Sequence, residues 1–148
     1  MTRCFKLTCT KWQLISSESR AGREVVSVEQ WSIWRANLDP VVGSEQGRTR
    51  PVLVISETAV NDILPVVNVL PITSRKPGRR VYPNEALLAP GTAGLTEESL
   101  VLTYQIRTLD KQRLSRFYGD LDDTALQKQI LAALFFQLGV KIKHGPAG

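Results

Sequence analysis

The sequence is poor in the residues from which many active sites are built. It contains one histidine, His144, and two cysteines, Cys4 and Cys9. A single histidine excludes catalysis by a histidine pair within one chain. Metal-binding Cys/His spacing, a Gly-Lys-Ser/Thr phosphate loop and a Gly-x-Ser-x-Gly nucleophile elbow are also missing. We therefore expect neither a metal nor another cofactor, and no disulfide framework, so a reducing compartment is compatible.

Long apolar runs are missing as well. No stretch is long enough to span a membrane, and residues 12–16 do not form the apolar core of a signal peptide. The default expectation is therefore a cytoplasmic protein. Its 148 residues suffice for one domain with a real core. The net charge of +5 favours an anionic partner, for which nucleic acid is the usual candidate. Composition alone does not separate RNA, DNA and an acidic protein.

Hydrophobic patterning predicts a mainly β chain that ends in one helix. Residues 33–39 alternate apolar and polar side chains, as a half-buried strand does. The continuously apolar run 52–55 predicts a central strand. Further elements are expected as follows: strands at 66–73, Glu85–Leu88, 100–107 and 117–121, a turn at 61–62 and a short helix at 110–116.

The segment 100–107 alternates strictly, which predicts two different faces on one strand. The set expected to face the core is Leu100, Leu102, Tyr104 and Ile106. The opposite face then presents Thr103, Gln105 and Arg107. We also expect Trp34 in the core, because it lies on the apolar face of its own strand, and not stacked on nucleobases.

The last regular element is expected to be a helix over Thr124–Leu138. Asp122 is expected as its N-cap and Gly139 as its stop signal. A wide apolar stripe follows the helical period at Leu126, Ile130, Leu134, Phe135 and Phe136. A stripe of this width indicates a core or dimer surface, and not a cofactor site.

A polar loop at 43–51 lies between two of the predicted strands. Gly43 and Gly47 allow backbone conformations and close approaches that other residues resist. Arg48 and Arg50 place two permanent positive charges on it. Taken alone, this composition is that of a solvated connection, and a loop signal this short is weak.

Three segments of the chain form a recognisable set of motifs. The first consists of LDP (38–40), GSEQG (43–47) and RPVLV (50–54), the second is PITS (71–74), and the third is QIRTLDK (105–111). Together they resemble the MazF/PemK family of toxin endoribonucleases: its first signature, the end of its third strand and its strand-end motif. The segments occur in the family's order at similar spacing, and the resemblance covers roughly residues 28–140.

The resemblance implies a fold, an activity and partners. The fold is a small, strongly twisted antiparallel sheet, SH3-like and partly barrel-shaped, with a long C-terminal helix. The activity is that of a toxin that cleaves single-stranded RNA without a metal. The implied partners are a second copy of the chain and a cognate antitoxin protein. Arg50 and Thr73 are implied to be central to cleavage, with Ser44, Glu45 and Gln105 nearby.

RNA cleavage constrains what these side chains can do. The nucleophile is the substrate's own 2′-hydroxyl, which predicts selectivity for RNA. Arg50 is a poor general base, because a guanidinium is not deprotonated in proteins, but it can clamp a phosphate with two hydrogen bonds. Thr73 can orient the 2′-hydroxyl. Glu45 is either a proton acceptor or the partner of Arg48 or Arg50 in a salt bridge, and both alternatives stay open.

Further residues are expected to bind the substrate. A basic loop at 74–80 is either a solvated connection or a rail for phosphates. The residues expected to bind RNA are Ser44, Gln46, Arg48, Gln105, Arg107, Arg75, Lys76, Arg79 and Arg80. The cleavage motif, the class of RNA and the identity of the antitoxin do not follow from the sequence.

Two questions of function and of domain limits stay open at this stage. The alternative function is that of a CcdB-like toxin, which shares the fold but poisons DNA gyrase by binding. The toxin domain is expected at 28–140, followed by a flexible tail at 141–148. Residues 1–27 show no period and are expected to be a disordered extension, an additional RNA-binding arm or the product of a start upstream of the true one.

Overall fold

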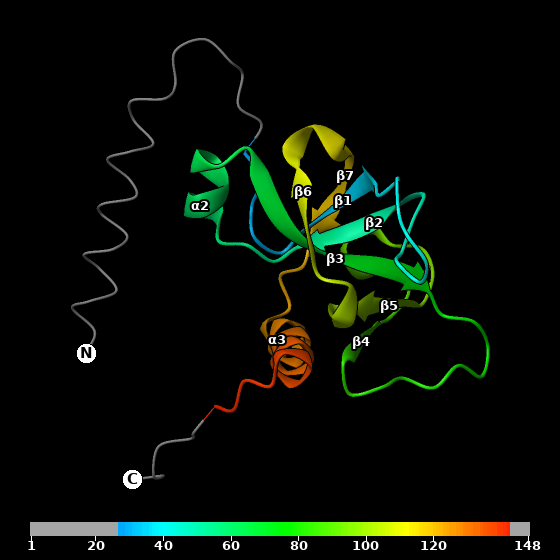
Figure 1. Ribbon diagram of the computed structural model, residues 1–148. Coiled ribbons are helices and arrows are strands. Elements are labelled where there is room, and N and C mark those ends of the chain that lie inside the picture. The colour runs from blue at the N-terminus through cyan, green and yellow to red at the C-terminus, as the bar shows by residue number, and fades with distance from the viewer. Residues whose placement is uncertain (1–26, 143–148) are drawn as a thin grey trace, which may run out of the picture.

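A strongly bent antiparallel sheet forms the centre of the computed structural model, which describes residues 27–142 (Figure 1). Six strands follow the order β4-β5-β3-β2-β1-β7, and β6 pairs with β3 beside this path. The strands are β1 (Ser32–Asn37), β2 (Thr49–Val54), β3 (Val66–Ser74), β4 (Glu85–Leu88), β5 (Ser99–Leu102), β6 (Arg107–Asp110) and β7 (Leu114–Asp120).

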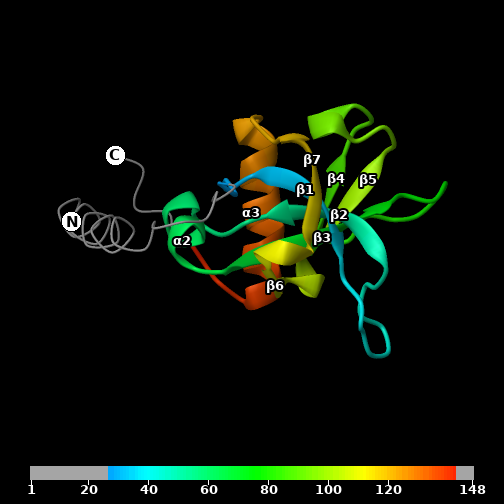
Figure 2. The same ribbon diagram turned by 90° about the horizontal axis from the view of Figure 1, so that it is seen from above.

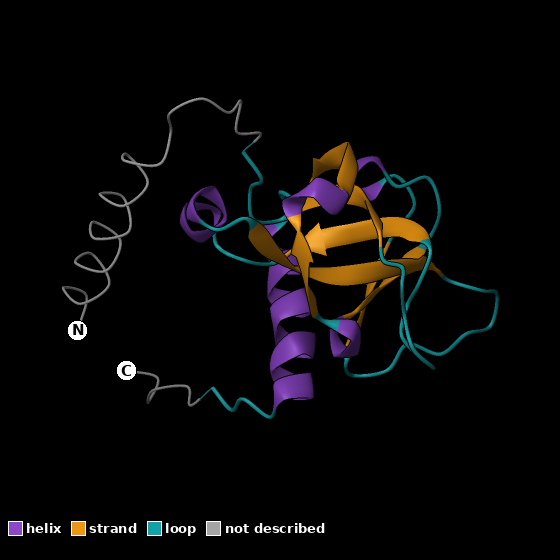
Figure 3. Ribbon diagram, turned by 45° about the horizontal axis from the view of Figure 1, so that its top comes forward, coloured by secondary structure: helices purple, strands orange, loops and turns teal. Residues whose placement is uncertain are grey.

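The length of β3 explains how the sheet bends. Its first part pairs with β6 through Val66 to Val69, and its last part pairs with β5 through Ile72 to Ser74. One strand therefore belongs to two leaves, which gives the twisted, partly closed sheet that was expected. The prediction of a mainly β fold with a long C-terminal helix is confirmed (Figure 3).

Within residues 27–142, two helices and three single 3-10 turns complete the fold. The short helix α2 (Thr58–Ile63) occupies the place where a turn was predicted, because Asn61 is buried and its amide donates to the carbonyls of Val28 and Ser56. The 3-10 turns are η1 (Thr92–Gly94), η2 (Thr103–Gln105) and η3 (Lys111–Arg113). The long helix α3 (Thr124–Leu138) lies beside β4 and η2 and runs past the sheet (Figure 2).

The sheet buries side chains on both faces. Leu53 belongs to one apolar cluster, which also contains Ile130 and Leu134 of α3. Its neighbours Val52 and Val54 belong to a second cluster on the opposite face. This double burial accounts for the continuously apolar sequence of β2 and confirms that the strand is central.

The segment 100–107 is not one strand, and this prediction was wrong. The chain leaves β5 after Leu102, makes the turn η2 and starts β6 at Arg107. Thr103 is buried, and its hydroxyl lies 2.6 Å from the carbonyl oxygen of Asn84 and 3.3 Å from that of Ala133. Because the turn reverses the alternation, Tyr104 and Ile106 are exposed and do not lie in the core.

Smaller differences concern element ends. The helix expected at 110–116 is only the turn η3, and β7 begins earlier than predicted. Asp123, and not Asp122, caps α3, since its carboxylate accepts hydrogen bonds from the backbone N–H groups of Ala125 and Leu126. Trp34 is partly buried and packs on Phe117, with 5.2 Å between ring centroids.

The described part begins at residue 27, one residue before the predicted start of the domain. Val28 is buried, and the Ser27 hydroxyl donates to Asp62 at 3.4 Å. Residues 1–26 lie outside the described residues, so the predictions for the extension stay predictions. Between residues 27 and 142, no helix combines the length and the apolar character that crossing a bilayer requires.

Candidate active site

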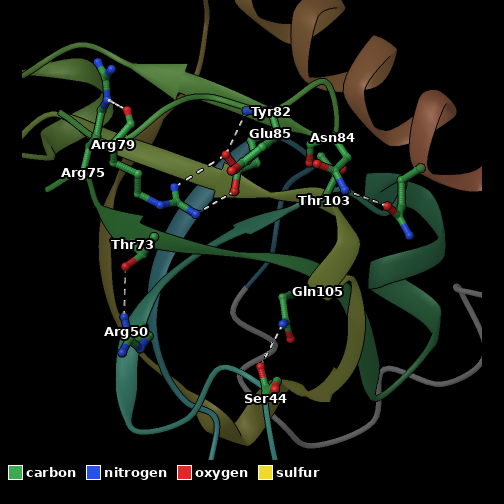
Figure 4. Close-up of polar contacts among 11 residues, drawn as sticks. Ser44, Arg50, Thr73, Arg75, Arg79, Tyr82, Asn84, Glu85, Thr103 and Gln105 are labelled. Carbon is green, nitrogen blue, oxygen red and sulfur yellow. Dashed lines mark hydrogen bonds and ion pairs between the residues drawn. The ribbon is translucent and has the colours of Figure 1, made fainter.

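Strand pairing brings Arg50 and Thr73 together. Val52 of β2 lies opposite Pro71 of β3. Continuing this antiparallel register by two residues places Arg50 opposite Thr73. The Arg50 guanidinium donates from Nη1 to the Thr73 hydroxyl oxygen at 3.2 Å (Figure 4). Two residues separated by 23 positions in the sequence thus form one polar unit at a shared end of their strands.

The guanidinium of Arg50 is held at two points. Its Nε donates to the carbonyl oxygen of Gly47 at 2.8 Å, and its Nη1 contacts Thr73. The other N–H groups have no acceptor among residues 27–142 and can bind an anion. Because Thr73 accepts this hydrogen bond, its own hydroxyl hydrogen is available to a second acceptor. The pair therefore presents several donors in a fixed orientation.

The base of the preceding loop is closed by Asp39, Gly47 and Arg48. The Leu38 N–H donates to the Arg48 carbonyl at 2.9 Å, and the Arg48 N–H donates to the Asp39 carboxylate at 2.8 Å. A Cβ on Gly47 would lie 2.7 Å from this carboxylate, so a side chain there would displace the group that accepts the Arg48 N–H. The LDP and GSEQG segments thus set the backbone that positions Arg50.

Gln105 holds the outer part of the same loop. Its side-chain amide donates to the Ser44 carbonyl at 3.1 Å and accepts from the Gln46 N–H at 3.3 Å (Figure 4). Arg107 donates to the Leu38 carbonyl at 3.1 Å. The structure thus brings Ser44, Gln46, Gln105 and Arg107 together. The recorded contacts of Gln105 and Arg107, however, are with residues 38–46, so these two side chains hold the loop in place.

A cleft of about 470 Å³ opens beside Arg50 and Thr73, and we call it the Arg50 cleft. Three arginines, Arg48, Arg50 and Arg116, are among its lining residues, and a site lined by arginines favours a phosphate. Its other lining residues are Thr49, Pro51, Ile72, Thr73, Ser74, Gly94, Leu95, Thr96, Glu97, Ser99 and Tyr118. The volume suits a small group such as one nucleotide unit.

Glu45 lies elsewhere. It lines a second cleft, of about 450 Å³, together with Gln105 and Arg107. Its carboxylate accepts the Val42 N–H at 3.1 Å. The ion pairs within residues 27–142 are Arg75–Glu98 and Arg79–Glu85, so the salt bridge of Glu45 with Arg48 or Arg50 was wrong. Glu45 is not among the residues lining the Arg50 cleft, which separates it from the Arg50–Thr73 pair.

The basic loop is only partly available to phosphates. Arg75 pairs with Glu98 at 2.9 Å. Arg79 pairs with the buried Glu85 at 2.7 Å (Figure 4). Arg75 also donates to the Arg79 carbonyl, which ties the two ends of the turn together. Lys76 and Arg80 are exposed and form no ion pair within the described residues. Two of the four expected positive charges therefore stabilise the loop itself.

Sequence reasoning missed Glu97, Arg116 and Tyr118 in the Arg50 cleft. Arg116 and Tyr118 lie two residues apart on β7, and a period-two pattern could have indicated them, but part of that segment was assigned to a helix. Tyr118 also sits at an irregularity, because Ile33 pairs with Gly119 while Trp34 pairs with Phe117. Such a bulge re-aims side chains near functional sites. No local pattern indicated Glu97.

Comparisons with known proteins agree with this geometry. The family model described as "PemK-like, MazF-like toxin of type II toxin-antitoxin system" matches residues 29–136. The chain is 39% identical over 101 residues to Endoribonuclease EndoA of Bacillus subtilis (strain 168), a match that covers 68% of this chain and 86% of that protein.

Solved structures show the same fold. The crystal structure of MazF (Form-I) from Deinococcus radiodurans is 28% identical, with a TM-score of 0.65, over 78% of this chain and 99% of that one. The MazE-MazF structure (Form-III) from the same organism is 26% identical, with a TM-score of 0.60, over 78% of this chain and 99% of that one. The family match, the sequence relative and the fold agree, so the chain belongs to the PemK-like and MazF-like toxins of type II toxin–antitoxin systems.

Proposed function

We propose that the chain is the endoribonuclease of a toxin–antitoxin system and that it cleaves single-stranded RNA at specific sequences. The observation that carries this proposal is the Arg50–Thr73 pair, with 3.2 Å between guanidinium nitrogen and hydroxyl oxygen at the edge of the Arg50 cleft. The relative EndoA is named an endoribonuclease. Single-stranded RNA is the favoured substrate because its base edges are exposed for recognition.

The reaction follows from the chemistry of the substrate. The 2′-oxygen attacks the adjacent phosphorus, and the bond from phosphorus to the 5′-oxygen breaks. The 2′-hydroxyl loses a proton, the 5′-oxygen gains one, and the products end in a 2′,3′-cyclic phosphate and a 5′-hydroxyl. Negative charge grows on the phosphoryl oxygens in the transition state, where preorganised donors stabilise it most.

Arg50 and Thr73 have complementary roles in this scheme. Arg50 clamps the phosphoryl oxygens through its remaining N–H groups, while Gly47 and Thr73 keep the guanidinium in place. The Thr73 hydroxyl, which accepts from Arg50, donates to the substrate. Arg48 and Arg116 add positive charge along the cleft. Glu45 closes the loop through Val42 and is not assigned a proton-transfer step.

Cleavage is expected to be independent of a divalent metal, because the nucleophile belongs to the substrate and the Arg50 cleft supplies guanidinium groups to the phosphate. Purified protein should cleave labelled single-stranded RNA at the same rate with EDTA and with magnesium. Analysis of the ends should give 2′,3′-cyclic phosphate and 5′-hydroxyl. Activity that EDTA abolishes and magnesium restores would contradict this expectation.

A homodimer accounts for an exposed apolar surface near the end of α3. Phe136 is 64% exposed and lines a shallow groove with Tyr82 and Tyr104, while Leu138 nearby in α3 is 56% exposed. An isologous contact would bury this surface. Light scattering at micromolar concentration should give the mass of a dimer, and Phe136→Asp should give a monomer. A wild-type monomer at that concentration would disprove the dimer.

The proposed partners are a cognate antitoxin and RNA, in the cytoplasm. A cleft that presents Arg48, Arg50 and Arg116 also suits an acidic protein segment that becomes ordered when it binds. Such a segment would cover Arg50 and compete with RNA. The alternative of a toxin that binds DNA gyrase is not favoured, since the matching family model is that of PemK-like and MazF-like toxins and the sequence relative is named an endoribonuclease.

A further inference from the structure

One wall of the Arg50 cleft is formed by the segment that joins η1 to β5. Leu95, Thr96 and Glu97 of this segment line the cleft, as does Ser99 at the start of β5. Glu97 carries the only carboxylate among the described lining residues. A carboxylate repels phosphate, so its presence beside three guanidinium groups requires a different explanation from theirs. It points to a part of the substrate that offers hydrogen-bond donors.

The backbone around Glu97 is held on both sides. The Leu95 N–H donates to the Thr92 carbonyl at 2.9 Å, and the Gly91 N–H donates to the Leu95 carbonyl at 2.7 Å. After Glu97, the Arg75 N–H donates to the Glu98 carbonyl at 2.9 Å, and the Glu98 side chain pairs with Arg75. These contacts fix where the Glu97 side chain leaves the wall.

The Glu97 carboxylate takes no part in the recorded contacts that hold residues 27–142 together. The Glu97 backbone carbonyl accepts from the Ser99 hydroxyl at 2.9 Å, but within residues 27–142 its carboxylate has neither a hydrogen bond nor an ion pair. The neighbouring Glu98 differs, because its carboxylate forms an ion pair with Arg75. Glu97 is also exposed, so its charge has no structural duty.

The two β7 residues that line the cleft, Arg116 and Tyr118, offer a flat surface. The Arg116 guanidinium lies over the Tyr118 ring, 5.5 Å from its centroid. Nucleobases stack on aromatic rings and on guanidinium planes in RNA complexes. A base that enters the cleft can therefore stack on this pair and turn its edge toward the acidic wall.

We propose, given RNA cleavage at this site, that Glu97 is a specificity-determining residue. Its carboxylate accepts hydrogen bonds from the base of a nucleotide next to the scissile phosphate. Guanine fits best, because its N1–H and its amino group match the two carboxylate oxygens side by side. Adenine and cytosine offer one amino group each. Uracil is disfavoured, since the two carbonyl oxygens that flank its single N–H donor would face the negative charge.

The test compares base preferences of wild type and Glu97→Gln. A random pool of single-stranded RNA is cleaved by each protein, and the ends are sequenced to give relative rates for every base near the cut. In the wild type, guanine should exceed uracil at one position next to the cut. In Glu97→Gln this ratio should fall roughly fivefold to a hundredfold, because an amide can donate to the uracil oxygens.

Glu57→Gln is the matched control. Glu57 is exposed at the start of α2, lines neither cleft and its change removes the same charge. It should keep the wild-type preferences. A Glu97→Gln protein that cleaves with unchanged preferences would overturn the assignment. An equal loss of rate on all sequences, with an altered pH profile, would also overturn it and make Glu97 a proton acceptor. A wild type that cleaves no RNA would overturn the proposed function together with it.

Discussion

Replacing Arg50 by lysine is expected to slow RNA cleavage by about a hundred- to a thousandfold while RNA affinity stays nearly unchanged. The net charge is preserved, so attraction of the RNA persists. The arginine fork is lost, and with it the simultaneous contacts to the Gly47 carbonyl and the Thr73 hydroxyl. A single ammonium group cannot reproduce both contacts and also clamp a phosphate with two parallel hydrogen bonds. The expected loss corresponds to about 2.7–4 kcal/mol of transition-state stabilisation.

Three measurements separate catalysis, attraction and folding. Single-turnover cleavage, RNA affinity and thermal melting are compared for the wild type, Arg50→Lys and Arg50→Ala. Arg35→Lys is the control, since Arg35 is exposed on β1 and lines neither cleft. Near-normal cleavage by Arg50→Lys would mean that Arg50 contributes only positive charge to RNA binding and has no role in catalysis. Melting that collapses in both Arg50 variants, but not in the control, would make Arg50 structural.

The Arg50–Thr73 pair could be anticipated because it lies on two neighbouring strands that the sequence pattern indicates. Both strands were recognised from apolar runs, and two neighbouring antiparallel strands bring their polar ends to one edge. The resemblance then implied that Arg50 and Thr73 are the polar residues at that edge that act in cleavage. The contact of Gln105 with Ser44 follows the same logic, since the two motifs that contain them were expected to be close.

The break at Thr103 could not be anticipated from pattern alone. Alternation over 100–107 is typical of one strand, but the Thr103 hydroxyl forms hydrogen bonds with carbonyls 19 and 30 residues away. These tertiary contacts stabilise the turn η2 against the local preference. Tyr104 and Ile106 become exposed as a consequence, and their surface is available to a partner.

The acidic wall of the cleft also depends on contacts that no local pattern records. The backbones of η1 and β7 approach each other closely at two glycines, Gly94 in η1 and Gly119 in β7. A Cβ on Gly119 would lie 2.9 Å from the Ala93 carbonyl group. This close approach joins the segment before Glu97 to β7, whose Arg116 and Tyr118 line the same cleft.

That approach leads to the second large expected effect, on stability. Gly94→Ala should lower the free energy of unfolding by about 2–5 kcal/mol, whereas Gly91→Ala should lower it by only about 1–2 kcal/mol. Both glycines have positive φ, +80° for Gly94 and +85° for Gly91, so alanine is strained at each. A Cβ at Gly94 would lie 2.4 Å from the Tyr118 carbonyl oxygen, but a Cβ at Gly91 would meet nothing within 4 Å.

The difference between these two variants isolates the contact of η1 with β7. The opposing atom belongs to the backbone of a paired strand, so it cannot turn away as a flexible side chain could. Urea unfolding of the wild type and both variants measures the difference directly. Equal losses would mean that η1 moves off β7 at little cost, and the wall that carries Glu97 would then be adjustable. A larger loss in Gly94→Ala, accompanied by relaxed base preference in its cleavage products, would establish that the fixed turn holds the wall in place.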